Sequence, residues 1–239
     1  MSEPSILYET EDFLAVLKPA GLVVHHGPHT LKSKDEPTLC EWLVLRYPEL
    51  KVVGDDPENR PGIVHRLDKD TSGIMLIPRN QKYFEYLKKI FQNHEVKKTY
   101  VALTAGKPKQ KEGVIDRAIG IKSGTTKRSI FSEKMAKSAI TRFSVVDVFE
   151  NNLNPKNISL VKIYPETGRT HQIRVHLASI GCPVLGDKLY GGIYKNITPR
   201  LMLHALAVEF LVKPGEKILI EAPLTEDFEK VLVEYKLEL

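Results

Sequence analysis

Seven apolar runs with the character of β-strands restrict the fold of this chain more than any other feature. They lie at Phe13–Leu17, Gly73–Ile77, Tyr100–Thr104, Ile140–Val148, Ile158–Tyr164, Ala205–Val212 and Ile218–Ile220. In the run at Ile158–Tyr164 apolar side chains occupy both alternating sets of positions, which predicts a strand that is buried on both faces.

Helical patterns lie between these runs. One follows Asn80 and extends to about Phe91, one follows Thr225, and a shorter one includes Leu39 and Leu43. The strand-like runs outnumber the helical patterns and do not alternate strictly with them. The order therefore predicts an α+β fold, with a mixed, mostly antiparallel sheet and flanking helices, rather than a doubly wound parallel sheet.

Positive charge is concentrated in one part of the chain. The net charge is +5, whereas the stretch from Lys97 to Arg142 contains 12 basic and 3 acidic residues and so carries +9 by itself. This stretch is either a surface for a polyanion such as nucleic acid or a solvated loop region rich in lysine.

The two cysteines and the first residues indicate a reducing compartment. Cys40 and Cys182 have no paired spacing and no neighbouring cluster of Cys and His, so neither a disulfide nor a zinc framework is expected. Acidic residues follow Met1 where a signal peptide needs basic ones, and no apolar run is long enough to span a bilayer. We therefore expect a cytoplasmic protein.

The densest polar cluster is the segment 61–72, which lies between turn residues and the run that starts at Gly73. It reads Pro-Gly-Ile-Val-His-Arg-Leu-Asp-Lys-Asp-Thr-Ser and places Asp68 and Asp70 two residues apart. A loop that enters a rigid strand commonly presents catalytic groups. The alternative is a polar turn whose carboxylates accept hydrogen bonds from backbone N–H groups.

A second polar cluster, the segment 166–176, reads Glu-Thr-Gly-Arg-Thr-His-Gln-Ile-Arg-Val-His. Thr170 is expected to cap a helix that ends at Gly181, with His171 and Arg174 on one face. An arginine on such a helix can bind a carboxylate of a distant loop with two hydrogen bonds, unless the face is simply solvated. His171 and His176 are five residues apart, which does not match the four-residue spacing of a helical zinc pair, so no metal is expected.

Together these segments resemble the RluA family of RNA pseudouridine synthases. The motifs that carry the resemblance follow one another in the family's order from about Ile6 to about Phe228: Lys18–His25, His65–Asp68 with Thr71–Gly73, Lys98–Tyr100, Gly168–His176 with Gly186–Asp187 and Tyr190–Gly191, Leu203–Ala205 and Ala222–Leu224. One departure is Leu17, where many members have Asn or another polar residue.

The resemblance implies an enzyme that isomerises specific uridines to pseudouridine in structured RNA, either rRNA or tRNA. It needs no cofactor, because the reaction involves no redox change and no group leaves for good. The resemblance makes Asp68 the catalytic carboxylate. Asp68 either adds to C1′ of the ribose or takes a proton from C2′, and the sequence leaves both routes open.

The resemblance also implies roles for residues around this carboxylate. Arg174 pairs with Asp68, Tyr100 packs on the target base, and Arg66 fills the gap that the flipped base leaves. Contacts with the RNA backbone are expected from three residues beside the predicted helix: Arg169, Thr170 and His171.

The expected organisation is a single catalytic domain over residues 1–239, without a separate N-terminal RNA-binding domain, which acts as a monomer on an RNA stem-loop. Two other functions are considered. One is a non-catalytic RNA-binding or RNA-chaperone protein on the same fold. The other is a glycoside hydrolase that uses Asp68 and Asp70, which is disfavoured because such enzymes hold their two carboxylates on opposite sides of a sugar.

Overall fold

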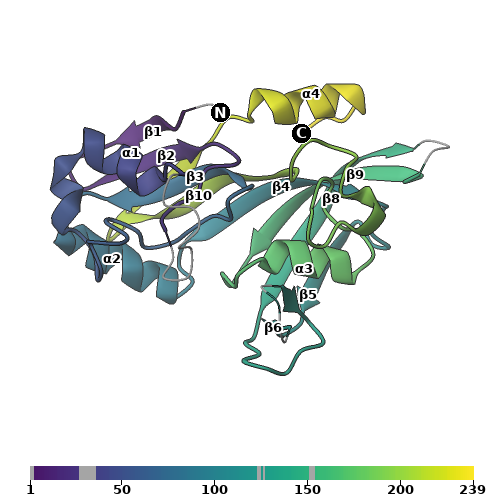
Figure 1. Cartoon of the computed structure of the whole chain (residues 1–239), viewed down its shortest axis with the longest axis horizontal. Coiled ribbons are helices and arrows are strands. Elements are labelled where there is room, and N and C mark those ends of the chain that lie inside the picture. Colours follow the sequence, from purple (N-terminus) through teal and green to yellow (C-terminus); the bar gives the residue numbers. More distant parts are fainter. Residues whose placement is uncertain (1–2, 27–35, 123–124, 126, 151–153) are drawn as a thin grey trace. The chain divides into compact units, whose positions relative to one another are not determined.

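The computed structural model describes residues 3–26, 36–122, 125, 127–150 and 154–239, and Figure 1 shows its helices and strands. The chain divides into two compact units. The first contains Met1–Lys97 and Leu206–Pro223, and the second contains Lys98–Ala205 and Leu224–Leu239. The expectation of a single catalytic domain stays a prediction.

The first unit is built on a sheet in the order β1-β2-β3-β10, with β11 paired to β10. Its strands are β1 (Ser5–Glu9), β2 (Phe13–Lys18), β3 (Ser72–Pro78), β10 (Leu203–Lys213) and β11 (Glu216–Glu221). The β1–β2, β2–β3 and β10–β11 pairs are antiparallel. Every residue of β3 is buried, because this strand lies inside the sheet and has apolar residues on both faces.

Two α-helices and a 3₁₀-helix complete the first unit: α1 (Leu39–Arg46), η1 (Pro48–Val52) and α2 (Gln81–Gln92). The predicted cap of α2 is confirmed, since the Asn80 side chain accepts a hydrogen bond from the backbone N–H of Tyr83 at 2.9 Å. The helix α1 begins with a capping box between Thr38 and Glu41, which the sequence analysis did not identify.

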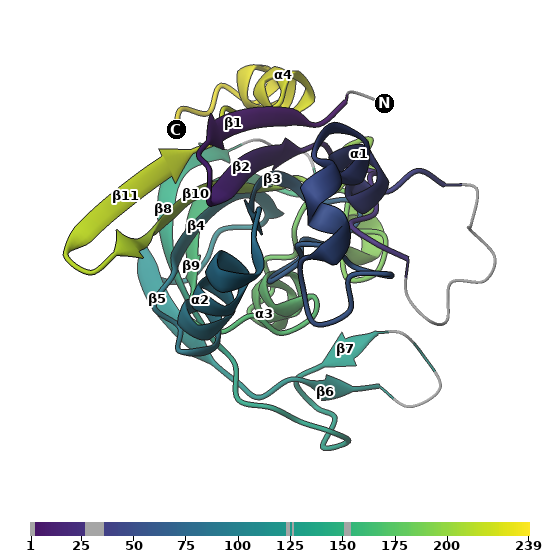
Figure 2. The ribbon, with the colours of Figure 1, turned by 90° about the vertical axis from the view of Figure 1, so that its left-hand side faces the viewer.

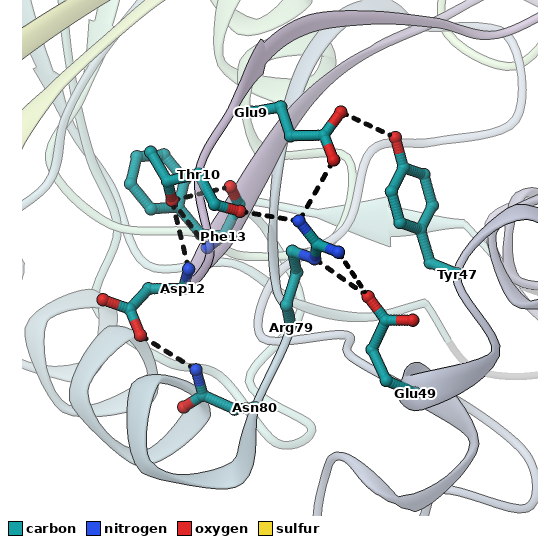
Figure 3. Close-up of polar contacts among 8 residues, drawn as sticks. All are labelled: Glu9, Thr10, Asp12, Phe13, Tyr47, Glu49, Arg79 and Asn80. Atoms are coloured by element: carbon teal, nitrogen blue, oxygen red, sulfur yellow. Dashed lines mark hydrogen bonds and ion pairs between the residues drawn. The ribbon is translucent and has the colours of Figure 1, made fainter.

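A polar network joins the start of α2 to the β1–β2 turn and to η1 (Figure 3). The guanidinium of Arg79 donates to the carboxylate of Glu9 at 3.0 Å, to that of Glu49 at 2.7 Å and to the Thr10 carbonyl at 2.8 Å. The Tyr47 hydroxyl donates to the second oxygen of Glu9 at 3.0 Å. Charge-assisted hydrogen bonds of this kind hold the β1–β2 turn, η1 and the start of α2 together within the first unit.

The second unit contains a four-stranded antiparallel sheet in the order β4-β9-β8-β5. Its strands are β4 (Lys97–Ala105), β5 (Glu112–Asp116), β8 (Ile140–Glu150) and β9 (Asn157–Pro165). The prediction that Ile158–Tyr164 is buried on both faces is confirmed for Ile158–Val161, but Tyr164 near the end of β9 is exposed.

The helices of this unit are α3 (Gln172–Ser179), the 3₁₀-helix η2 (Gly192–Tyr194) and α4 (Glu226–Glu234). A small separate ribbon, β6 (Gly120–Ile121) with β7 (Arg128–Ser129), lies next to α3 (Figure 2). All strand pairs with a described register in both units are antiparallel, and the predicted α+β fold class is confirmed. Within the described residues, no helix is both long and apolar enough to cross a membrane.

Candidate active site

The loop 61–72 leads into β3 and carries Asp68. Gly62 lies near its beginning at φ +67°, a left-handed backbone that favours glycine, and an added Cβ would lie only 3.2 Å from the Ile77 side chain. Leu67 is buried and anchors the middle of the loop. The backbone N–H of Thr71 donates to the Asp68 carbonyl at 3.1 Å, which closes a turn directly after the carboxylate. The position of Asp68 is therefore fixed from both sides.

Lys18 holds this loop from the end of β2. Its side chain is fully buried, and its ammonium donates to three backbone carbonyl oxygens: Pro19 at 2.8 Å, Leu22 at 2.9 Å and Lys69 at 3.0 Å. The Gly21 N–H donates to the same Lys69 carbonyl at 2.9 Å. An ammonium has three hydrogen-bond donors, so three carbonyls use its full capacity. The Lys18-Pro19 motif thus ties its own turn to the residue next to Asp68.

The residues on either side of Asp68 divide between the protein interior and solvent. The His65 ring accepts a hydrogen bond from the Leu76 N–H at 2.9 Å and stacks on Phe91 with ring centroids 4.4 Å apart. Arg66 is exposed, and Asp68 itself is half-buried. Since His65 is anchored to β3 and α2, the backbone from which the exposed Arg66 side chain extends is held in place.

The prediction that Thr170 caps the second-unit helix is wrong. The helix α3 begins at Gln172, and its N-cap is His171, which has a left-handed backbone with φ +58° and makes no capping bond with its side chain. The Gln172 carboxamide oxygen accepts the Arg169 N–H at 3.0 Å instead, so a turn occupies residues 169–172. The end of the helix before Gly181, at φ +78°, is confirmed.

Arg174 is buried in α3 and makes a bidentate ion pair with Asp187. Its Nε and one terminal nitrogen each donate to a different oxygen of that carboxylate at 2.8 Å. Burial alone would raise the pKa of Asp187, but the hydrogen bonds and charge of Arg174 outweigh it, so the pKa lies below its ordinary value. Asp68 belongs to the first unit and Arg174 to the second, and their pairing stays a prediction.

Sequence reasoning did not find Asp187 as a partner of Arg174. The only signal was the Gly186-Asp187 pair in the resemblance, which says nothing of what the carboxylate binds. The structure explains the glycine: at φ +72°, an added Cβ on Gly186 would lie 1.9 Å from the Arg200 carbonyl. This close approach of two backbone segments brings Asp187 to the helix.

A buried network on α3 anchors the strand β8. The Gln172 carboxamide donates to the Ile140 carbonyl at 2.9 Å and to the Thr141 hydroxyl at 3.0 Å. The two ring nitrogens of His176 lie 2.9 Å from the Thr141 hydroxyl and from the Arg117 carbonyl. A carbonyl only accepts, so Nε2 carries the proton and Nδ1 accepts from Thr141. This arrangement holds in a neutral His176, and burial favours the neutral ring by lowering the pKa of His176.

The free energy of unfolding is expected to fall as the pH drops below 6.5, in part because of His176. Burial lowers its pKa below the ordinary 6.5, outweighing the hydrogen bond to Arg117 and the charge of Asp116. The unfolded chain then binds the proton more readily than the folded one, so stability is complete above pH 6.5 and declines towards the lowered folded pKa. Urea unfolding of the wild type and His176→Asn between pH 7.5 and 5 measures this. Equal pH slopes for the two proteins would contradict it.

The remaining predicted site residues lie on the second unit. Tyr100 is half-buried in β4, where its Cα pairs with that of Ile163 in β9. Thr170 is exposed, whereas Arg169 donates through Nε to the Ser138 carbonyl at 3.0 Å. His171 lies with its Nδ1 2.9 Å from the Tyr190 hydroxyl. The structure thus gathers Arg169, Thr170, His171 and Arg174 at the beginning of α3.

The basic stretch of the sequence has two kinds of lysine. Some pair with acids, such as Lys107 with Glu150. Others lie on what we call the basic hairpin, which is the described part of residues 119–139. Among the described residues, four of its lysines form no ion pair within 4.0 Å: Lys122, Lys127, Lys134 and Lys137. An aromatic residue that lies between Lys127 and Lys134 in the sequence, Phe131, is 87% exposed.

Metal-binding groups do not gather in this region. In the part of the chain that the structure describes, no three side chains of His, Cys, Asp or Glu lie close enough together to hold a metal ion. Cys40 and Cys182 are both free and buried, and burial raises the pKa of the Cys40 thiol to about 12.

A family model described as "RNA pseudouridylate synthase" matches residues 12–179. An "Uncharacterized RNA pseudouridine synthase" of Aquifex aeolicus (strain VF5) is 41% identical over 198 residues, which are 83% of this chain and 59% of that protein. "Ribosomal large subunit pseudouridine synthase D" of Borreliella burgdorferi is 34% identical, over 86% of this chain and 60% of that protein. The chain thus spans about three fifths of the length of these two relatives.

The fold also has a solved counterpart. The structure titled "Human RNA Pseudouridylate Synthase Domain Containing 4" superposes with a TM-score of 0.73 and 25% sequence identity, and the match covers 98% of this chain and 94% of that one. The resemblance to the RluA family that the motifs indicated is confirmed.

Proposed function

This chain belongs to the RNA pseudouridylate synthase family, and from that premise we propose that it isomerises uridine to pseudouridine within structured RNA with Asp68 as the catalytic carboxylate. The observation that carries the assignment of Asp68 is the way its loop is held. The buried ammonium of Lys18 binds the backbone of the next residue, and the Thr71 N–H closes the turn behind it. Such preorganisation is what a reacting group needs.

The proposed reaction is an isomerisation, so it leaves the composition of the uridine unchanged. The N1–C1′ bond breaks, the uracil turns while it is held in the site, and C5 bonds to C1′. C5 then loses its proton and N1 gains one. Asp68 either bonds to C1′ and is displaced by C5, or removes a proton from C2′ and later returns it.

Six other residues are proposed to support this reaction. Arg174 supports Asp68, and Tyr100 offers a ring on which the target base packs. A uridine in a stem must leave its stack at a cost of a few kcal/mol, and packing on an aromatic ring returns about 1–3 kcal/mol. Arg66, which is exposed in the loop that carries Asp68, occupies the gap that the base leaves. Arg169 and Thr170 at the start of α3, together with His171, contact the RNA backbone.

The basic hairpin is proposed to bind the RNA backbone. RNA binding gains much of its free energy from the release of counterions, so the affinity should fall steeply with salt. Replacing Lys127 and Lys134 with Ala should make the slope of log K against log[salt] shallower by about 1.4–1.8, because each lost phosphate contact removes about 0.7–0.9. Lys107→Ala is the matched control, since Lys107 is already paired with Glu150. Titrations at several salt concentrations that give the same slope for all three proteins would contradict a role for the hairpin.

The proposed activity is tested by tritium release. Pseudouridine formation frees the hydrogen at C5, so the wild-type protein should release tritium from an RNA transcript that carries [5-³H]uridine. A non-catalytic RNA-binding protein, the second candidate, would bind the transcript and release none.

The name of the Borreliella relative supports large-subunit rRNA as the substrate, and tRNA is the alternative. Pseudouridine mapping in cells with and without the gene distinguishes the two. We also propose a cytoplasmic monomer that acts on a stem-loop.

A further inference from the structure

Tyr190 lies where the basic hairpin meets the beginning of α3. Its hydroxyl accepts a hydrogen bond from the backbone N–H of Arg128 in β7 at 2.8 Å. The same hydroxyl lies 2.9 Å from Nδ1 of His171, the left-handed N-cap of α3. The ring packs against a small buried cluster that joins the base of the hairpin to the helix, formed by Ile119, Ala139 and Val175.

Tyr190 also contacts Arg174. The guanidinium carbon lies 5.3 Å from the centroid of the Tyr190 ring, close enough for a cation–π interaction. The backbone N–H of Tyr190 donates at 3.0 Å to the Asp187 carboxylate, and this carboxylate also accepts hydrogen bonds from the Arg174 guanidinium. A guanidinium bound at its edge by a carboxylate and over its face by a ring has one strongly preferred orientation.

The backbone around Tyr190 is held tightly. The Gly191 N–H donates to the Asp187 carbonyl at 2.8 Å, and an added Cβ on Gly191 would lie 2.4 Å from that oxygen. The turn 187–191 therefore closes as one compact loop and offers the ring little room to move. A shift of the hairpin at Arg128 acts directly on a side chain that touches Arg174.

We propose that Tyr190 is a positioning residue that couples RNA contact on the basic hairpin to the orientation of Arg174. This inference rests on the proposed function, in which Arg174 supports the catalytic carboxylate. RNA that binds the hairpin lysines holds β7 in place, and β7 holds the Tyr190 hydroxyl through the Arg128 N–H. Part of the binding free energy gained at the hairpin then increases the rate of the chemical step, in addition to increasing the affinity for RNA.

The first test replaces Tyr190 with Phe, which keeps the ring and removes only the hydroxyl. On a large-subunit rRNA transcript of the same organism carrying [5-³H]uridine, the single-turnover rate at saturating enzyme should fall about tenfold, whereas the Kd changes by less than about twofold. Tyr194→Phe is the matched control, because it removes a hydroxyl whose partner among the described residues is the exposed side chain of Asn154. It should leave both quantities unchanged. A Tyr190→Phe rate equal to the wild-type rate would overturn the proposal.

The second test is a double-mutant cycle with a hairpin variant in which Lys127 and Lys134 are Ala. In the wild-type background, the hairpin variant should lower the single-turnover rate. If Tyr190 transmits the effect of the hairpin, the same two substitutions should cause no further decrease in this rate in the Tyr190→Phe background. Additive losses would show that the hairpin and Tyr190 act independently, and the coupling would be rejected. If the wild-type protein releases no tritium from rRNA or tRNA transcripts, the proposed function fails instead, so the two failures are distinct.

Discussion

Asp68→Asn is expected to lower the rate of pseudouridine formation by about 10²-fold to 10⁴-fold or more while the protein stays folded. The amide has nearly the shape of the carboxylate but carries no charge, so it can neither add to C1′ nor take a proton from C2′. The loop around it is held by the Lys18 ammonium and the Thr71 N–H through backbone carbonyls, which the substitution leaves in place. The fold should therefore survive.

The matched control is Asp70→Asn, which makes the same change in the same loop two residues away. Asp70 has no role in the proposed reaction, so this variant should keep the wild-type rate within about twofold. Tritium release measures the rate, and circular dichroism checks the fold. If Asp68→Asn is as active as the wild type, or if Asp70→Asn loses as much activity, the assignment of the carboxylate is wrong.

Lys18→Met is expected to lower the free energy of unfolding by about 3 kcal/mol or more. Methionine has a similar length and fits a buried site, but it donates no hydrogen bond to the carbonyls of Pro19, Leu22 and Lys69. A buried carbonyl that loses its partner costs about 1–3 kcal/mol. The carbonyls of Pro19 and Leu22 lose theirs, whereas that of Lys69 keeps the hydrogen bond from the Gly21 N–H. Because Lys69 follows Asp68, the loop should also loosen and the rate should fall.

The control for this substitution is Lys89→Met on the exposed face of α2, which should change the stability by less than about 0.5 kcal/mol. Urea unfolding of both variants gives the free energies. If Lys18→Met unfolds at the same urea concentration and with the same slope as the wild type, the three hydrogen bonds do not stabilise this turn.

The elements that could be predicted from the sequence are those with a strong local pattern. The buried strand β3 is one continuous apolar run, and α2 has both an apolar face and an Asn cap. The strands β1 and β5 were not predicted, because each is a five-residue strand at a sheet edge with a mixed burial pattern. The start of α3 was misplaced because residues 169–172 form a turn, in which the Gln172 side chain accepts from the Arg169 N–H, and no side chain caps the helix.

The same distinction between local pattern and tertiary contact applies to the residues of the site. Loop 61–72 and the start of α3 were recognisable because their polar residues stand next to apolar elements. The partners of these residues were not recognisable. Lys18 binds a carbonyl 51 residues away, and Arg174 binds Asp187, which follows the close approach of Gly186 to the Arg200 backbone. No periodicity in the sequence records hydrogen bonds to backbone atoms, because every residue type offers the same carbonyl.

The α+β class, the family and the residue types available for chemistry can be read from the amino-acid sequence, since they follow from apolar periodicity and from motifs in order. Which groups hold one another depends on how the chain packs. The tertiary structure places the Lys18 ammonium among three carbonyls, Asp187 on Arg174, and Tyr190 between the basic hairpin and α3. Buried polar groups must find partners wherever the packed backbone brings them, and that packing is a property of the whole fold.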